Sequence, residues 1–335
     1  MRFVRRYLVP RLIQYVLVII LGITVVFFIP RLLPTGPVES TINTLRAQGA
    51  YLDPAAVEET VRTLREMYGL EAGLLGQYAS FWKRLFTGDF GPSLVMFPTP
   101  VIQLIRQSLP WTVGLLLVTT VLGWIFGNIS GGLSGYFTRS RILKIVDGMA
   151  MFVRPIPYYV LALMLIILFA YLLPVFPIGG GYTIGARISF TWSFVTDVLK
   201  HAFLPAMSLM LLGAAVTHQT MRLIVQSVKD EDYIRYAKIG GVKERTIFAQ
   251  YVMRNAMLPQ ITGLTLSLGQ IFGGALITEI VFAFPGIGFL LFRAITTSDY
   301  NVIMGITTIS IVAITTGILI IDLLYPLFDP RIRFK

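Results

Sequence analysis

The chain is 335 residues long, 55% hydrophobic and only 13% charged, whereas soluble domains carry about a quarter charged residues, so we expect it to lie in a lipid bilayer. It contains no cysteine, which excludes disulfides, thiolate catalysis and cysteine metal sites. Its formal net charge of +11 is gathered in short loops beside apolar runs, a distribution typical of membrane proteins that argues against a nucleic-acid partner.

The first apolar run extends from Leu12 to Pro30, carries no charge and is long enough to cross about 30 Å of hydrocarbon as a helix. Four arginines within the first eleven residues precede it. Because basic residues gather on the cytoplasmic side, residues 1–33 are predicted to be a cytoplasmic N-terminus followed by transmembrane helix 1. No A-x-A-like site follows, which argues against a cleaved signal peptide.

Residues 34–110 have the composition of a soluble excursion. Between Pro34 and Pro100 acidic residues outnumber basic ones, which suits the outside of the cell. Asp53-Pro54 opens a helical pattern that ends near Gly69. We therefore predict an extracytoplasmic segment between transmembrane helices 1 and 2.

The second span, from Trp111 to Thr138, carries a glycine at every fourth position over its second half. This spacing strips one helix stripe of side chains and predicts close packing against a neighbouring helix. The stripe consists of Gly123, Gly127, Gly131 and Gly135.

The third span covers roughly residues 145–173, and Pro155 and Pro157 are expected to break or kink its inner half. Asp147 and Arg154 lie two turns apart on one helix face, which predicts an ion pair. Arg154 is also a candidate for the transport path, although such arginines more often snorkel or pair with a neighbour. A loop then returns outside, and the fourth span runs from about His201 to Met221.

A charged stretch, residues 222–258, separates the fourth and fifth spans and has more basic than acidic residues, as expected of a cytosolic surface. Ser227 and Asp230 have capping-box spacing, which predicts that a helix begins nearby. A second helix is expected from about Lys243 until Pro259 interrupts it. Glycines between the two helices provide left-handed backbone freedom.

The fifth span, about Pro259 to Phe284, carries Thr265, Gly269 and Gly273 on one stripe, with Gln270 and Glu279 as polar groups. Glu279 is predicted to lie near the outer interface, where it either hydrogen-bonds the following turn or helps to gate a path. The sixth span, about Val302 to Tyr325, ends inside. Six spans with both termini cytoplasmic satisfy the charge asymmetry.

The charged stretch resembles the EAA loop of ABC-transporter permease subunits, and specifically of the oligopeptide/dipeptide family. That family reads roughly DY-x-R-x-A, a glycine, then RNA-x-x-P. The corresponding residues here are Asp232, Tyr233, Arg235, Ala237, Gly241, Arg254, Asn255, Ala256 and Pro259. Arg235 and Tyr236 replace the glutamate and first alanine of the general EAA pattern, and Gly240 replaces a basic residue. Pieces of the extracytoplasmic segment, the TEIVFAFPGIG stretch and the C-terminal tail are also similar to the family.

The resemblance implies an all-α integral membrane protein with the type I ABC importer permease fold, residues 111–335 forming its core. It implies a bacterial or archaeal cytoplasmic membrane location and a partnership with a second permease subunit, identical or paralogous. Two cytoplasmic ATPases would dock on the loop from Asp232 to Gly241, and an extracytoplasmic binding protein would deliver the solute. Peptide is the leading solute; oligosaccharide and other small solutes remain open. The extracytoplasmic segment would cap the path, meet the binding protein or act as a scaffold.

The sequence has no nucleotide-binding P-loop, since it contains no Gly-Lys pair, and no local histidine metal motif. We therefore expect no cofactor and no catalysis in this chain, with ATP hydrolysed by a separate subunit. One alternative is an ATP-independent channel or secondary carrier. A remote one is an intramembrane serine protease, with Ser134 as nucleophile and His218 as base.

Overall fold

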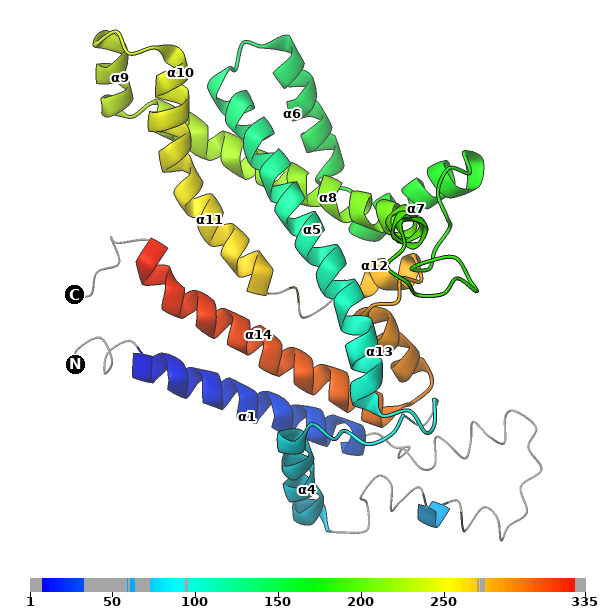
Figure 1. Ribbon diagram of the computed structural model, residues 1–335. Helices are drawn as coiled ribbons and strands as arrows, with labels where there is room; N and C mark the ends of the chain where they lie inside the picture. The colour runs from blue at the N-terminus through cyan, green and yellow to red at the C-terminus, as the bar shows by residue number, and fades with distance from the viewer. Residues whose placement is uncertain are drawn as a thin grey trace. The chain divides into compact units, whose positions relative to one another are not determined.

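The computed structural model describes residues 8–32, 59, 61–63, 73–93, 96–269, 271 and 275–328. These residues form helices and no strand, apart from an isolated bridge between Pro92 and Pro100. The chain divides into two compact units (Figure 1). Unit 1 comprises Met1–Trp111 and Gly286–Leu319, and unit 2 comprises Thr112–Pro285 and Ile320–Lys335.

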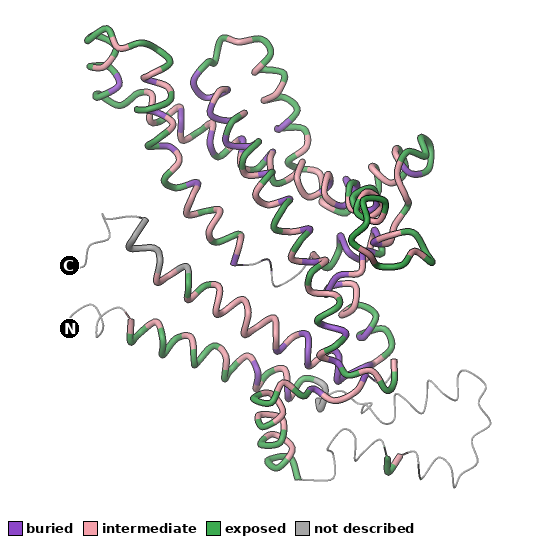
Figure 2. The backbone as a smooth tube through the Cα atoms, viewed as in Figure 1, coloured by how far each residue is buried: buried purple, intermediate pink, exposed green. Residues whose placement is uncertain are grey.

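The described part of the chain has four candidate membrane spans, or five if a bent pair of helices counts as one span. Four are single helices: α1 (Val9–Leu32), α5 (Val101–Tyr136), α8 (Trp192–Lys229) and α14 (Tyr300–Phe328). The fifth combines α6 (Arg141–Val153) with α7 (Tyr158–Ile166) and its continuation η2 (Ile167–Leu172), and it is bent by 105° between α6 and α7. The break predicted at Pro155 and Pro157 is therefore confirmed. Along α1 many large apolar side chains are exposed, as lipid-facing residues would be (Figure 2).

Three predicted boundaries differ from the structure. α5 begins at Val101 rather than Trp111, inside the stretch that was predicted to be an extracytoplasmic segment. α8 begins at Trp192 rather than His201, because a helix can continue beyond the apolar run from which its length was inferred. The predicted fifth span corresponds to α11 (Arg254–Gly269) and α12 (Leu276–Val281). Between them Gln270 and Gly273 lie outside the described residues, so a continuous fifth span stays a prediction.

Unit 1 has its core where the start of α5 meets α13 (Ile287–Thr296) and the start of α14. The buried apolar residues are Phe90, Val101, Leu104, Ile105, Ile287, Ala294, Val302 and Ile306. A Cβ added at Gly305 would lie 2.6 Å from Val101 Cγ1, so glycine is needed for this approach. α4 (Leu74–Thr87) joins α1 through a 2.7 Å hydrogen bond between the hydroxyls of Tyr78 and Thr24.

Unit 2 is built on the close packing of α5 against α8 along the glycine stripe. A Cβ added at Gly131 would lie 2.2 Å from the His218 carbonyl oxygen, and one at Gly135 would lie 2.7 Å from the Arg222 carbonyl oxygen. Real Cβ atoms essentially never come this close to backbone atoms, so the predicted packing role of these glycines is confirmed. α8 also contacts α6, α7 and α11, and its buried residues run from His201 to Val225. It is the central support of this unit.

Candidate functional site

The charged stretch folds as a short helix, α9 (Asp232–Ile239), at the end of unit 2 opposite α12 (Figure 1). Glu231 is its N-cap, and Asp232 and Lys238 lie in its first and last turns, where their charges complement the helix dipole. The predicted start of a helix near Asp230 is confirmed, since α9 begins at Asp232, but Ser227 does not cap it, because Ser227 belongs to α8, which continues to Lys229. The backbone turns at Asp230, and α9 begins after it.

One side of α9 is anchored and the other is exposed. Ile234 is fully buried in an apolar cluster with Met221, Val225, Ile247 and other residues. On the outward side Tyr236 is 73% exposed and Ile239 is 84% exposed. Large apolar side chains on a short, well-anchored helix form a surface suited to a protein partner.

A tight turn at Gly240 and Gly241 ends α9. Gly240 N donates to Tyr236 O at 2.9 Å, and Val242 N donates to Ala237 O at 3.1 Å. Only Gly241 has a left-handed backbone, with φ +75°, while Gly240 has φ −71°. Of the two predicted hinge glycines, Gly241 is therefore the one that the turn requires.

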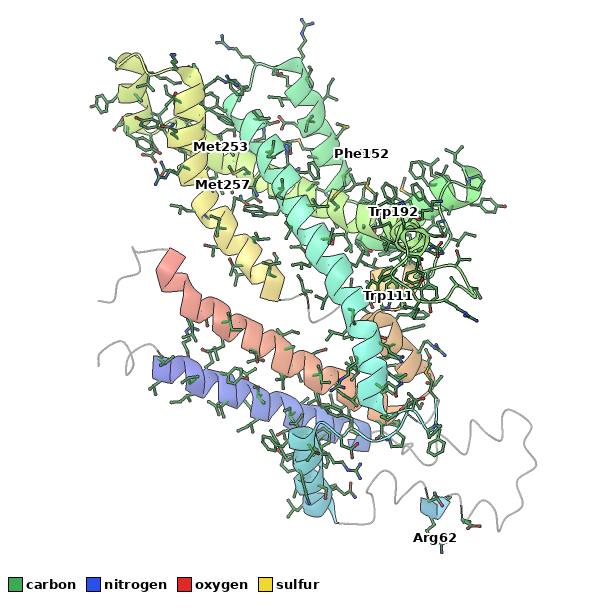
Figure 3. The ribbon with its side chains drawn as sticks, viewed as in Figure 1. Arg62, Trp111, Phe152, Trp192, Met253 and Met257 are labelled. Carbon is green, nitrogen blue, oxygen red and sulfur yellow. The ribbon has the colours of Figure 1, made fainter. Side chains whose placement is uncertain are left out.

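The helix after the turn is longer than predicted. α10 (Glu244–Thr246) continues into a π-helical segment, η3 (Ile247–Met253), and then into α11, which contains Pro259. The predicted interruption at Pro259 is wrong. Ala256 and Gln260, on either side of the proline, are both buried, so tertiary packing holds the helix despite the missing backbone donor. Met253 packs against α5, since a Cβ added at Gly132 of α5 would lie 2.6 Å from the Met253 Sδ atom. Figure 3 labels Met253 and Met257 along the continuous helix from α10 to α11.

The structure brings together several residues predicted for this site. Asn255 Nδ2 donates to the Tyr233 hydroxyl at 3.1 Å, joining α11 to α9. Asp232 and Arg235 approach to 3.9 Å, but both side chains are largely exposed, so this pair contributes little to stability. Ala237 is half-buried against the apolar cluster and Arg254 is exposed.

Tyr136, the last residue of α5, is a central contact that the sequence did not single out. Its hydroxyl donates to Glu244 Oε2, its ring centroid lies 5.2 Å from that of Phe248, and its carbonyl accepts from Lys229 Nζ at 3.1 Å. Lys238 Nζ lies 6.0 Å from the centre of the same ring. The end of α5 thus contacts α8, α9, α10 and η3 together. Tyrosine is common at the ends of membrane spans, where it lies at the interface, so its position in the sequence did not indicate these partners.

Glu279 on α12 is fully buried. Its Oε1 accepts a 2.7 Å hydrogen bond from Thr112 Oγ1 on α5, and its carbonyl accepts from Phe284 N at 2.8 Å. The backbone of Glu279 therefore bonds the turn beyond it, as one of the two predicted roles requires, while its carboxylate reaches another helix. Gln270, the other polar candidate on this span, lies outside the described residues.

The predicted Asp147–Arg154 pair is wrong, because each of the two side chains interacts with residues of α8 instead. Asp147 lies 2.8 Å from His218 Nε2 and 3.2 Å from Arg222 Nε. Arg154, at the end of α6, donates to Gln219 Oε1. Packing against α8 supplies nearer partners than the neighbour two turns away.

The serine and histidine of the protease alternative do not meet. His218 Nδ1 lies 2.8 Å from Ser130 Oγ, whereas Ser134 donates to the Leu143 carbonyl at 3.4 Å. Ser130 also donates to its own helix, at Phe126 O. This geometry argues against Ser134 as a nucleophile activated by His218.

The sequence matches the family described as "Binding-protein-dependent transport system inner membrane component" over residues 127–334. The chain belongs to this family. The permease is 33% identical over 317 residues to the oligopeptide transport system permease protein AppB of Bacillus subtilis, covering 94% of this chain and 96% of the relative. It is 27% identical to the dipeptide transport system permease protein DppB of Lactococcus lactis, covering 98% and 99% of the two chains.

A third relative, the probable D,D-dipeptide transport system permease protein DdpB of Escherichia coli, is 30% identical to the permease over 291 residues, covering 83% of this chain and 85% of the relative. The resemblance inferred from the charged stretch is confirmed. Membership of a permease family, together with the separation of Ser134 from His218, favours the permease over the serine protease. The permease is an integral membrane protein with an all-helical fold in its described part.

Proposed function

We propose that this permease is the membrane-spanning subunit of an ATP-driven peptide importer. A second permease subunit, identical or paralogous, completes the path, two ATPases dock from the cytoplasm, and an extracytoplasmic binding protein delivers the peptide. The names of the oligopeptide and dipeptide permeases that it matches support the solute. ATPase docking on α9 rests chiefly on one observation: Tyr236 and Ile239 are exposed on a helix that Ile234 anchors.

The proposed topology has six membrane spans with both termini in the cytoplasm. Its first span lies in residues 1–33, residues 34–110 form an extracytoplasmic segment, and residues 111–335 form the core with the coupling loop at 222–258. Four candidate spans support it; α6 and α7, taken together as one bent span, would supply a fifth, and α11 with α12 the sixth. The basic excess of the coupling loop favours its cytoplasmic placement in a bacterial or archaeal cell membrane.

The proposed coupling is mechanical. Closure of the ATPases shifts α9 and the turn at Gly241, and two links carry this shift onward. The hydrogen bond of Tyr233 with Asn255 leads into α11, and that of Tyr136 with Glu244 leads into α5. The second link extends the mechanism beyond the fifth span. Such coupling requires contacts that differ between the two states of the transporter.

Glu279 and Arg154 have separate proposed roles. Full burial and the bond to Thr112 support Glu279 as a fixed link between α12 and α5 beside the path, rather than a freely moving gate. Arg154 is engaged by Gln219, which supports a role in fixing the bend between α6 and α7 to α8. Gln270 is retained as a candidate lining residue on the sequence alone.

Removing the exposed ring at Tyr236 tests the docking surface. We expect Tyr236→Ala to lose most copurification of the ATPase and at least tenfold of peptide uptake, because large exposed aromatics at an interface centre often carry over 1.4 kcal/mol, roughly a factor of ten. Tyr171→Ala is the matched control, since Tyr171 is 76% exposed but lies on η2. Equal uptake and copurification in both variants would contradict docking at α9. Uptake that survives ATP depletion and follows an ion gradient would instead indicate a channel or secondary carrier.

A further inference from the structure

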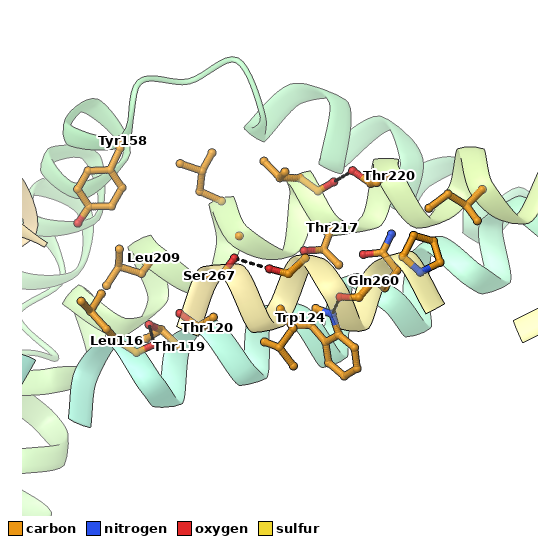
Figure 4. Close-up of a pocket in the computed structure, with 17 residues that line it drawn as sticks. Leu116, Thr119, Thr120, Trp124, Tyr158, Leu209, Thr217, Thr220, Gln260 and Ser267 are labelled. Atoms are coloured by element: carbon orange, nitrogen blue, oxygen red, sulfur yellow. Dashed lines mark hydrogen bonds between the residues drawn. The ribbon is translucent and has the colours of Figure 1, made fainter. Parts of the chain in front are cut away.

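A cavity of about 550 Å³ lies within unit 2 between α5, α8 and α11, with Tyr158 of α7 at its edge (Figure 4). Its volume falls in the range of about 300–1,000 Å³ that is usual for small-molecule sites. Leucine and valine side chains, including Leu116, Leu209 and Val216, form much of its wall, and none of the described residues that line it is charged. A charged side chain entering here would lose its hydration without gaining a counter-ion, so the cavity favours uncharged groups.

Three of the hydroxyl groups along the cavity offer acceptors rather than donors. Thr119 donates to Leu115 O at 2.8 Å, Thr220 donates to Val216 O at 3.0 Å, and Ser267 donates to Gly263 O at 3.0 Å. The hydroxyl hydrogens of these three residues are therefore used by their own helices. The oxygen atoms retain lone pairs that can accept a hydrogen bond from a ligand.

Gln260 supplies the complementary donor. It is 7% exposed, and its Nε2 has no hydrogen-bond partner among the described residues. Trp124 Nε1 donates to the backbone carbonyl of Gln260 at 2.9 Å, which fixes the Gln260 backbone. Figure 4 shows the Gln260 amide on α11 directed toward α8, where Thr217 and Thr220 lie. Buried amide donors are almost always paired, so an unpaired one beside a cavity leaves a donor for a ligand bound there.

We propose that this cavity binds the peptide in transit, with Gln260 Nε2 donating to a backbone carbonyl and the hydroxyl oxygens accepting from backbone N–H groups. An internal peptide unit carries one donor and one acceptor and no charge, which matches what the cavity offers, so the site holds the middle of the peptide and not its charged ends. The apolar walls accommodate uncharged side chains of varied shape. Because the contacts are to the backbone, the site accepts many sequences. This proposal rests on the importer function proposed above and adds a binding site to it.

Import by the complete transporter tests the role of Gln260. The assay uses proteoliposomes with the binding protein outside, ATP inside and a defined mixture of alanine peptides four and five residues long, in which internal peptide units lie away from the charged ends. Gln260→Leu has nearly the same volume but no donor, so we expect kcat/KM for import to fall about tenfold. Its Tm should be unchanged or higher, because an unpaired buried donor has been removed. Gln14→Leu, an exposed position on α1, is the matched control.

Absence of import by the wild type would overturn the importer function itself. Wild-type import with an unchanged kcat/KM in Gln260→Leu would overturn only the binding site. A Gln260→Leu variant that loses import and Tm together would also overturn it, because the residue would then be structural.

Direct occupancy is measured by cysteine labelling, which is possible because the chain has no cysteine of its own. In the complete transporter, Ser267→Cys should react with a maleimide at least threefold more slowly when the alanine peptides are being imported. Ser193→Cys, exposed at the start of α8 and away from the cavity, should react at one rate throughout. Labelling of Ser267→Cys that peptide does not slow, or that never occurs because another part of the transporter fills the cavity, would overturn the proposal.

Discussion

Gly131 marks the closest approach between α5 and α8 along the glycine stripe, so its replacement by alanine tests directly how these helices pack. The new Cβ would lie 2.2 Å from the His218 carbonyl oxygen, whereas ordinary van der Waals contact begins at 3.4 Å. The obstacle is backbone, so the helices would have to separate by more than about 1 Å, and a gap of this size forfeits a quarter to a half of each dispersion contact. We expect Gly131→Ala to lower the free energy of unfolding by about 3 kcal/mol.

The same helix provides a graded series of controls. At Gly123 the nearest backbone atom to an added Cβ is 3.3 Å away, and at Gly114 nothing lies within 4 Å. Gly123→Ala should therefore cost much less than Gly131→Ala, and Gly114→Ala should be neutral or stabilising, because alanine favours a helix over glycine by about 1 kcal/mol. The measurement is thermal unfolding of the purified permease in detergent. If Gly131→Ala were as stable as Gly114→Ala, the packing of α5 on α8 described above would be wrong.

Two further predictions concern the turn after α9 and the charges on α8. Gly241→Leu should abolish uptake and ATPase stimulation while membrane insertion persists, because the backbone at φ +75° disfavours any side chain. Gly240→Leu is the control and should retain more uptake, because Gly240 has φ −71°. Equal losses of uptake in the two variants would refute this reasoning. Asp147→Asn should lower the free energy of unfolding by about 2 kcal/mol, because Arg222 loses its 3.2 Å partner in a mostly buried setting. Asp232→Asn removes one partner of an exposed pair and should change the free energy of unfolding by less than about 1 kcal/mol. Thermal unfolding measures both variants, and a similar loss of stability in the two would contradict the difference expected between a mostly buried and an exposed ion pair.

The sequence predicted features that depend on local backbone chemistry. The four-residue spacing of glycines indicated a close helix contact, and Pro155 with Pro157 indicated the break that separates α6 from α7. Spacing could not identify the partner helix, because any neighbour with a flat face satisfies the same pattern. Only the folded chain assigns that partner as α8.

Predictions that depended on competition between local and distant contacts were wrong. Asp147 and Arg154 have the right spacing for a pair, but His218, Arg222 and Gln219 of α8 lie closer in space. Pro259 disfavours a helix locally, yet burial on both sides of it keeps α11 continuous. In the candidate site, the family motif indicated the residues of α9. Tyr136 belongs to no such motif and lies 108 residues from Glu244, so its role depended on the three-dimensional fold.

The dependence of unit 2 on α8 has a consequence for biosynthesis. α5, α6 and α7 leave the ribosome before α8, and the contacts of the α5 glycine stripe lie on residues from Met210 to Val225. At about 5–20 residues per second, many seconds pass between translation of the stripe and translation of its complement. During that interval the glycine face lacks the α8 contacts that cover it in the folded protein. The order of the helices along the chain therefore makes the insertion of α8 the step at which this half of the protein can first acquire its native packing.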